Sequence, residues 1–146
     1  MYKSITQLKC IFSKKTEGID IVDEQYNQDY EALTFSLNGK TYKSRLAKKT
    51  PTKAGYFVTC WTKDENNRNQ PYSIDTFTDY LIIIVIDEEL NGYFLFPRKL
   101  LKEKGILSSS EQKGKMAFRV YPRWCEHLNK TAEQTKKWQC KYFFEY

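Results

Sequence analysis

The chain has 146 residues, a net charge of +6, and 11 Tyr, 9 Phe and 3 Trp, which excludes a disordered chain because so many aromatic side chains need a core or a partner. The longest apolar run, residues 80–86, is too short for a transmembrane helix, which needs about 20 residues. We therefore expect a single domain over residues 1–146 with no membrane segment and no secretory signal.

The N-terminal third predicts one helix and one β-hairpin. Ser4 and Gln7 form a capping box, and apolar residues at helical spacing follow them, so a helix is expected over 4–15. Alternating apolar residues in 32–47 flank the pair Asn38-Gly39. Because Asn-Gly supplies both positive-φ residues of a type I′ turn, this segment predicts a hairpin.

The middle of the chain predicts a loop and then three strands. Residues 48–55 contain Pro and Gly and predict the loop, and residues 56–61 are aromatic and β-branched, as in a strand. Residues 80–86 are continuously apolar, which indicates a central strand covered on both faces. Asn91-Gly92 predicts the turn of a second hairpin that ends in the strand 93–96.

The C-terminal third predicts a helix, a strand and a last helix. A helix is expected over 98–104 and a stop at Gly105. A strand is expected over 116–121, and a helix over 131–144 with a capping box that begins at Thr131. This order predicts a mixed α/β (α+β) domain with a mixed central β-sheet flanked by helices. The α-β-β-β-α-β core of the restriction-endonuclease-like fold can be threaded through it with one extra hairpin strand.

The charge is divided into blocks along the chain. Residues 40–63 carry seven basic and no acidic side chains, residues 64–97 have a net charge of −6, and residues 98–146 have a net charge of +7. A solvated face is one interpretation. A surface that follows phosphates is the other, and the aromatic residues among the cations favour it, because clustered cations release counterions from nucleic acid.

Hydroxyl, cationic and aromatic side chains of the two basic blocks form the predicted nucleic-acid surface. Loop cations and hydroxyls contact phosphates, and aromatic rings stack on bases. Trp61, however, alternates with Phe57 and could also belong to the core. The predicted contacts are Arg45, Lys48, Lys49, Thr50, Thr52, Lys53, Trp61, Lys63, Arg119, Arg123, Trp124, Lys136 and Lys137.

Catalytic motifs are mostly absent from the sequence. His127 is the only histidine, which excludes a histidine triad, and residues 125–127 (Cys-Glu-His) are too closely spaced to form a tetrahedral metal site alone. No expected strand carries the acid-x-Lys motif of metal-dependent nucleases. Asp75 and Asp79 near Lys63 remain weak candidates for a Mg²⁺ or Mn²⁺ site, although such a pair is more often a cap or an ion pair. No metal site and no other cofactor is predicted.

The four cysteines lie far apart in the sequence and form no CxxC pair. They are Cys10, Cys60, Cys125 and Cys140. This spacing indicates free thiols rather than a disulfide framework, and it favours a cytoplasmic location.

Several blocks of the sequence match a known protein family. They include AKKTPTK at 47–53, GYFLFP at 92–97, GKMAFRVYPRW at 114–124 and NKTAEQTKKWQ at 129–139. On these blocks the chain resembles the MepB family of small bacterial cytosolic proteins. The resemblance implies a restriction-endonuclease-like fold that kept a nucleic-acid surface and lost its metal centre. It supplies no catalytic residues for this chain.

Three functions are consistent with the sequence. The first is a non-catalytic DNA- or RNA-binding protein with little sequence preference. The second is a Mg²⁺- or Mn²⁺-dependent nuclease that uses Asp75 and Asp79. The third is a regulatory module that docks an acidic partner through its basic face, and the acidic block 64–97 would even permit self-association.

Overall fold

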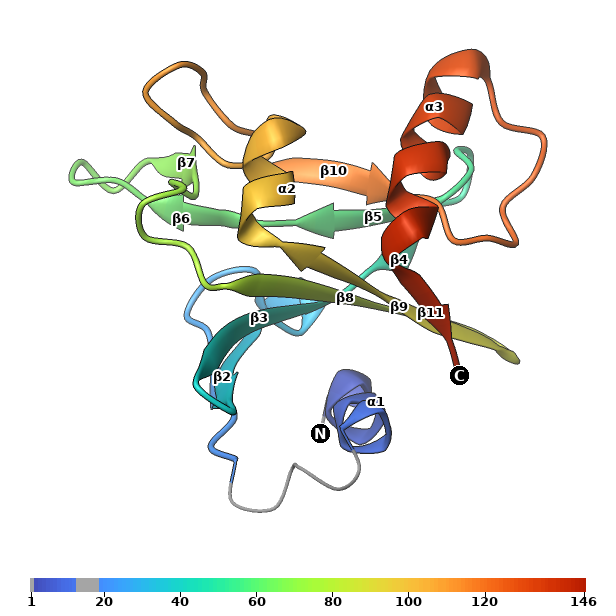
Figure 1. The fold of residues 1–146 in the computed structure, drawn as a ribbon, viewed down its shortest axis with the longest axis horizontal. Coiled ribbons are helices and arrows are strands. Elements are labelled where there is room, and N and C mark those ends of the chain that lie inside the picture. The colour runs from blue at the N-terminus through green and yellow to red at the C-terminus, as the bar shows by residue number, and fades with distance from the viewer. Residues whose placement is uncertain (1, 13–18) are drawn as a thin grey trace.

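A six-stranded sheet forms the middle of the molecule in the computed structural model, which describes residues 2–12 and 19–146 (Figure 1). Its order is β1-β2-β3-β8-β9-β11. The strands are β1 (Val22–Asp23), β2 (Leu33–Leu37), β3 (Lys40–Leu46), β8 (Tyr80–Asp87), β9 (Leu90–Pro97) and β11 (Phe143–Glu145). Strands β3 and β8 are parallel and the other neighbours are antiparallel. The expected mixed α/β class with a mixed central sheet is therefore confirmed.

Strand β8 joins the two halves of the core, as its continuous apolar run predicts. Leu81, Ile83 and Val85 pack on one face of the sheet, whereas Ile82 and Ile84 pack on the other, and all five are fully buried. Successive side chains of a strand point to opposite faces, so only a strand covered on both sides can bury all of them.

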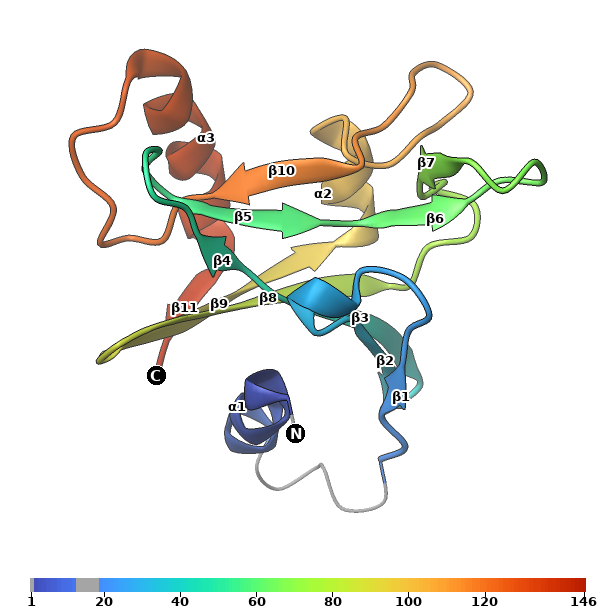
Figure 2. The ribbon, with the colours of Figure 1, turned by 180° about the vertical axis from the view of Figure 1, so that it is seen from behind.

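A second layer of strands covers one face of this sheet (Figure 2). It contains the three-stranded sheet β10 (Ala117–Val120), β5 (Tyr56–Thr59), β4 (Lys48–Lys49), and the pair β6 (Trp61–Lys63), β7 (Asn69–Pro71). The strand expected over 56–61 is therefore split at Cys60. Its first half pairs with β10 and β4 and its second half pairs with β7, and a local pattern does not reveal such a change of partner.

The described residues form three α-helices on the outside of these layers: α1 (Lys3–Ile11), α2 (Arg98–Glu103) and α3 (Lys130–Gln139). Helices α2 and α3 lie on the same side of the central sheet as the second layer, and α1 lies on the other side (Figure 1). Two short 3₁₀ turns, η1 (Gln28–Tyr30) and η2 (Cys140–Tyr142), also form in the described residues.

In the described part of the chain, no helix is long and apolar enough to cross a membrane. All four cysteines are free, as expected.

The capping predictions are wrong at both terminal helices. The Ser4 backbone N–H and hydroxyl both donate to Glu31 Oε1 at 2.8 Å instead of closing a capping box. The last helix is capped by Asn129, whose side chain accepts from the Ala132 N–H at 2.8 Å. The end of the expected first helix, residues 13–15, lies outside the described residues.

The last helix also ends earlier than its sequence predicts. It stops at Gln139, and the chain continues through η2 into β11. Phe143 pairs with Phe94 of β9 and is buried in the core. Burial of this aromatic side chain in the sheet outweighs the helical preference of the segment.

The first hairpin turn is confirmed, whereas the second is displaced. Asn38 and Gly39 have φ of 51° and 77°, as a type I′ turn requires. In the second hairpin Asp87 pairs with Leu90, so the turn lies at residues 88–89 and Gly92 lies inside β9. Glycine is required there because a Cβ atom would overlap the Phe143 ring.

Candidate functional site

Three hollows lie around helix α3. The first, of about 630 Å³, lies between the end of α2 at Lys104 and one face of α3. The second, of about 340 Å³, lies over β10 and shares Lys104, Thr135 and Trp138 with the first. The third, of about 500 Å³, lies between residues 52–54 and α3 and shares Thr135 with both others. We call this continuous surface the α3 groove.

Lysines surround the α3 groove, and none of the described residues that line it is acidic. The six lysines are Lys53, Lys104, Lys115, Lys130, Lys137 and Lys141. All six are exposed, and within the described residues none of them forms an ion pair. A concave surface with charges of one sign concentrates the electrostatic potential, so the groove attracts anions.

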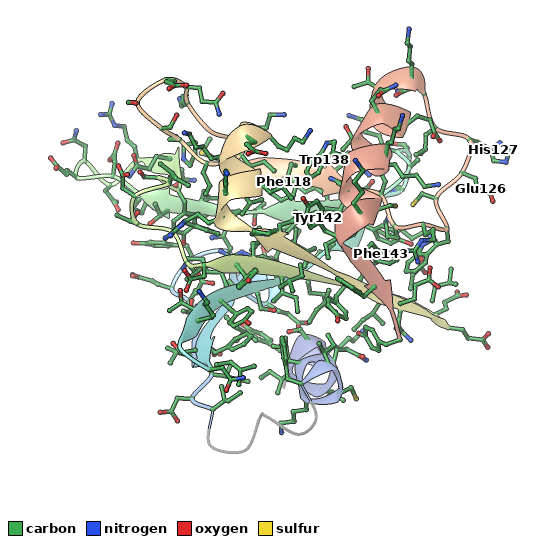
Figure 3. All side chains as sticks on the ribbon, in the orientation of Figure 1. Phe118, Glu126, His127, Trp138, Tyr142 and Phe143 are labelled. Atoms are coloured by element: carbon green, nitrogen blue, oxygen red, sulfur yellow. The ribbon has the colours of Figure 1, made fainter. Side chains whose placement is uncertain are left out.

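Aromatic side chains form part of the groove wall. Trp138 lines the first two hollows, Phe118 lines the second, and Tyr121 lines the second and the third. The Trp138 and Phe118 side chains are labelled in Figure 3. The Trp138 ring packs on Phe96 with 5.5 Å between ring centroids, and Lys104 Nζ lies 5.1 Å from the Trp138 ring centre. The groove therefore combines cations with an aromatic surface that is partly accessible.

Arg119 lines the groove, as its prediction as a contact requires, and its side chain also holds the neighbouring loop. Its Nη2 donates to Thr50 Oγ1 at 2.6 Å and to the Ala54 carbonyl at 2.8 Å, and its Nε donates to the same carbonyl at 3.1 Å. The guanidinium and the Thr50 hydroxyl thus form hydrogen bonds within the protein. They hold the loop 50–55 against β10, and this places Thr52 and Lys53 at the groove.

Lys48 and Lys49 lie on the other side of that loop, in β4. Lys48 Nζ lies 5.1 Å from the centre of the Tyr30 ring, and Lys49 Nζ lies 3.2 Å from Asp87 Oδ2. Lys49 lines a further hollow of about 240 Å³, which is also lined by Asp87 and Glu126 and shares Lys53 and Ala54 with the third hollow. Lys53 therefore lies at both the α3 groove and this smaller hollow, whereas Lys49 lines none of the three hollows of the groove.

Trp124 belongs to a hydrogen-bond chain in this smaller hollow. Its indole N–H donates to the Tyr56 hydroxyl at 2.9 Å, and that hydroxyl donates to Asp87 Oδ2 at 2.6 Å. The bond from Tyr56, followed by the ammonium of Lys49, lowers the pKa of the Asp87 carboxyl. Burial raises the pKa of the Tyr56 hydroxyl. These contacts fix the Trp124 ring in place.

Arg45 is buried, so its prediction as a phosphate contact is wrong. Its side chain is fully buried and forms an ion pair with Glu24. Its Nε donates to the Thr59 carbonyl at 3.0 Å. Lys43 Nζ also contacts Glu24 Oε1 at 3.0 Å, and the Tyr72 hydroxyl donates to the same oxygen at 3.2 Å. Arg45 therefore joins β3 to β5 in the core instead of facing a ligand.

Trp61 and Lys63 lie on β6 and line none of the three hollows. The Trp61 ring stacks on Tyr26 with 5.3 Å between centroids, and Lys63 Nζ lies 5.3 Å from the Trp61 ring centre. The fold places this cation-aromatic pair outside the α3 groove.

Arg123 and Lys136 hold the loop before α3. Arg123 Nη1 lies 3.2 Å from Glu145 Oε1, and Lys136 Nζ donates to the Cys125 carbonyl at 2.6 Å. Of the two lysines predicted in the last helix, only Lys137 lines the groove. Glu126 and His127 stand at the outside of this loop (Figure 3), where His127 lines the third hollow of the groove and Glu126 lines the hollow of about 240 Å³.

The two predicted carboxylates have structural partners or lie in solvent. Asp79 Oδ2 accepts from the Thr41 backbone N–H at 2.9 Å and from its hydroxyl at 3.1 Å. These bonds lower the pKa of Asp79. Asp75 is exposed in a turn, where its N–H donates to Ser73 Oγ. Within residues 2–12 and 19–146, no three His, Cys, Asp or Glu side chains are grouped so that they could hold a metal ion.

Four groove lysines were absent from the sequence prediction: Lys104, Lys115, Lys130 and Lys141. Lys130, Lys137 and Lys141 are seven and four residues apart, a spacing that places side chains on one face of a helix. This signal was present in the sequence. Lys104, directly after α2, and Lys115, in the loop before β10, are brought to the groove only by the tertiary structure.

A protein-family model and a solved structure each match most of the chain. The model of the MepB-like family matches residues 24–145. A crystal structure of MepB is 74% identical, the match covers 99% of this chain and 97% of that chain, and the TM-score is 0.89. A bacterial homing endonuclease, I-Ssp6803I, is 15% identical over 92% of this chain and 86% of that chain, with a TM-score of 0.47. None of the curated proteins matches the chain.

Proposed function

The chain belongs to the MepB-like family, and from this premise we propose that it binds nucleic acid, DNA or RNA, with little sequence preference. The observation that carries the proposal is the α3 groove, with six exposed lysines and no acidic residue among the described residues that line it. Lysine ammonium groups contact phosphates as point charges, and each contact gains free energy because counterions are released.

The low sequence preference follows from the side chains that the groove offers. Bases are most often distinguished by bidentate contacts from Arg, Asn or Gln. Among the described residues that line the groove, Arg119 donates to loop carbonyls, the Asn129 side chain caps α3, and the Gln139 amide bonds the backbone of residues 119 and 121. Gln134 is the one such amide that is exposed, so few side chains are available to distinguish bases. The remaining cations are lysines, which hold the backbone but carry no sequence information.

Binding without cleavage is the expected activity. The Asp79 carboxylate accepts two hydrogen bonds from Thr41, and Asp75 lies in an exposed turn. Neither carboxylate lines the α3 groove. A nucleic acid held in the groove would therefore not meet the pair of carboxylates that metal-dependent hydrolysis needs.

The test is fluorescence anisotropy with labelled single- and double-stranded DNA and RNA of two unrelated sequences, at about 50 and about 200 mM salt, a range in which phosphate contacts weaken strongly. We expect binding at low salt, similar affinity for both sequences, and intact probe after incubation with Mg²⁺ or Mn²⁺. Lys130→Glu with Lys137→Glu should abolish binding. Lys3→Glu with Lys9→Glu is the matched control, because these exposed lysines lie on α1, on the other side of the central sheet (Figure 1).

Three results would overturn the proposal in different ways. Equal loss of affinity in both double variants would show that overall charge, not the groove, controls binding. Metal-dependent cleavage would instead support the nuclease based on Asp75 and Asp79. Absence of binding at low salt, together with a mass that rises with protein concentration, would favour a protein-docking role and self-association.

A further inference from the structure

The turn between β8 and β9 carries acidic side chains on a projecting part of the central sheet. It extends beyond β11 at one end of the molecule (Figures 1 and 2). Glu88 and Glu89 form the turn and Leu90 follows, and we call these three exposed residues the β8–β9 tip. Within the described residues neither glutamate forms an ion pair. The tip therefore presents two free carboxylates, with an apolar side chain that is 46% exposed beside them.

The turn itself does not require glutamate. Two-residue hairpin turns favour Gly, Asn and Asp, because these residues adopt positive φ angles with little strain. The first hairpin follows this rule with Asn38 and Gly39. Glu88 instead has a φ of 57°, which is uncommon for a residue of its kind. Such strain at an exposed position indicates a function for the side chain rather than a need of the backbone.

The α3 groove has the complementary charge and shape. Its first hollow, of about 630 Å³, is lined by lysines and by Trp138, and none of its described lining residues is acidic. A projecting anionic surface is attracted to a concave cationic one, and opposite potentials determine which two surfaces meet. The apolar Leu90 next to the glutamates matches the indole among the lysines. The lysines of this hollow are Lys104, Lys130, Lys137 and Lys141.

The tip of one chain cannot bend into its own groove. Strands β8 and β9 are paired residue by residue, from Tyr80 with Pro97 to Asp87 with Leu90. The Tyr56 hydroxyl also holds the Asp87 carboxylate at 2.6 Å, directly before the turn. The tip is therefore fixed in the sheet, and only a second copy can bring it to a groove. Because tip and groove are different surfaces, such a contact is head-to-tail and builds chains or rings.

We propose that the β8–β9 tip of one copy docks into the α3 groove of a second copy, with Glu88 and Glu89 against the groove lysines. The contact itself does not depend on nucleic acid. Its consequence rests on the proposed function: tip and nucleic acid use the same lysines, so each excludes the other. The protein then self-associates at high concentration when nucleic acid is scarce, and nucleic acid releases it.

The test is sedimentation equilibrium of the full chain at about 50 and about 200 mM salt, because contacts between exposed charges weaken as salt rises. Protein concentrations extend to about 1 mM, where a weak contact is populated. At low salt we expect the mass to rise above the 17.4 kDa of one chain, and to return to it at the higher salt. Glu88→Lys with Glu89→Lys should abolish the rise. Asp20→Lys with Glu65→Lys is the matched control, because these exposed carboxylates lie outside the tip, and it should retain the rise.

A charge exchange identifies the two surfaces. Lys130→Glu with Lys137→Glu should also abolish the rise, although it lowers the net charge from +6 to +2, since each change subtracts two charges. Lower net charge by itself favours association, so a loss here cannot result from general repulsion. A mixture of the tip variant and this groove variant should regain the rise, because the reversed tip then meets a reversed groove. Recovery in the mixture also shows that both variants are folded.

The outcomes separate this contact from the proposed function. A constant mass in the wild type at low salt, equal loss in the control variant, or no recovery in the mixture would overturn the docking, whereas binding of labelled nucleic acid would still support the proposed function. Self-association with the expected variant pattern, but without nucleic-acid binding, would support the docking and overturn the proposed function. If an oligo-thymidine strand binds without lowering the mass, the shared use of the groove is wrong.

Discussion

Neutralising Lys130, Lys137 and Lys141 should reduce the salt dependence of nucleic-acid binding by a calculable amount. The three side chains line one wall of the α3 groove, and alanine preserves helix propensity. Each phosphate contact to a single strand contributes about 0.7 to the slope of log K against log salt, so six lysines give a slope of about −4. A rise from about 50 to about 200 mM salt should then weaken wild-type binding about 300-fold.

The triple variant keeps three groove lysines, namely Lys53, Lys104 and Lys115. Its slope should be about −2, and the same rise in salt should weaken binding only about 20-fold. Anisotropy titrations at five or more salt concentrations measure both slopes. The control is a triple alanine variant at Lys3, Lys9 and Lys40, which are exposed and line none of the groove hollows.

Two results would refute this reasoning. An unchanged slope in the groove variant would mean that these lysines do not contact phosphates. An equal change in the control variant would mean that the slope reports net charge and not the groove. In either case the six lysines would be a solvated surface, which is the simpler interpretation of the same charge pattern.

Two further predictions concern the charges that hold the fold together. Glu24→Ala should lower the free energy of unfolding by about 3–5 kcal/mol, because it leaves the buried guanidinium of Arg45 and the ammonium of Lys43 without a counter-charge. Urea denaturation measures this free energy. A loss below about 1 kcal/mol would contradict the assigned ion pair. Asp87→Asn should reduce the dependence of stability on acid pH. The pKa of Asp87 is lowered in the folded state, first by the bond from Tyr56, so its contribution is present above the ordinary carboxyl pKa of about 3.9 and is lost as pH falls through the lower folded value. Urea midpoints at neutral and at acid pH should differ less in Asp87→Asn than in the wild type, and an equal difference would exclude this carboxyl as the source.

Local signals predicted much of the fold correctly. The Asn38-Gly39 turn depends on backbone angles that few residue types adopt, and the apolar run of β8 can be satisfied only between two covering layers. Helix α2 spans Arg98–Glu103, and Gly105 after it has a φ of 73°. Each of these features is specified by residues that are neighbours in the sequence.

The errors occur where contacts between distant segments decide the structure. The Gly92 position is a close approach to Phe143 and not a turn, and the segment after Gln139 becomes a strand because β9 offers it an edge. The restriction-endonuclease-like core that the resemblance implies, the single-domain organisation and the cytoplasmic location stay predictions.

For the candidate site, the sequence by itself determined the sign and the abundance of the charge, the presence of aromatic residues among the cations, and the spacing of Lys130, Lys137 and Lys141. Only the tertiary structure decided which cations line the α3 groove. Arg45 and Arg119 have the same charge as the groove lysines, yet one is buried against Glu24 and the other binds loop carbonyls. The physical reason is that a guanidinium with five donors can satisfy several acceptors inside the protein, whereas a lysine on a flexible stem gains most by remaining in water until a phosphate arrives.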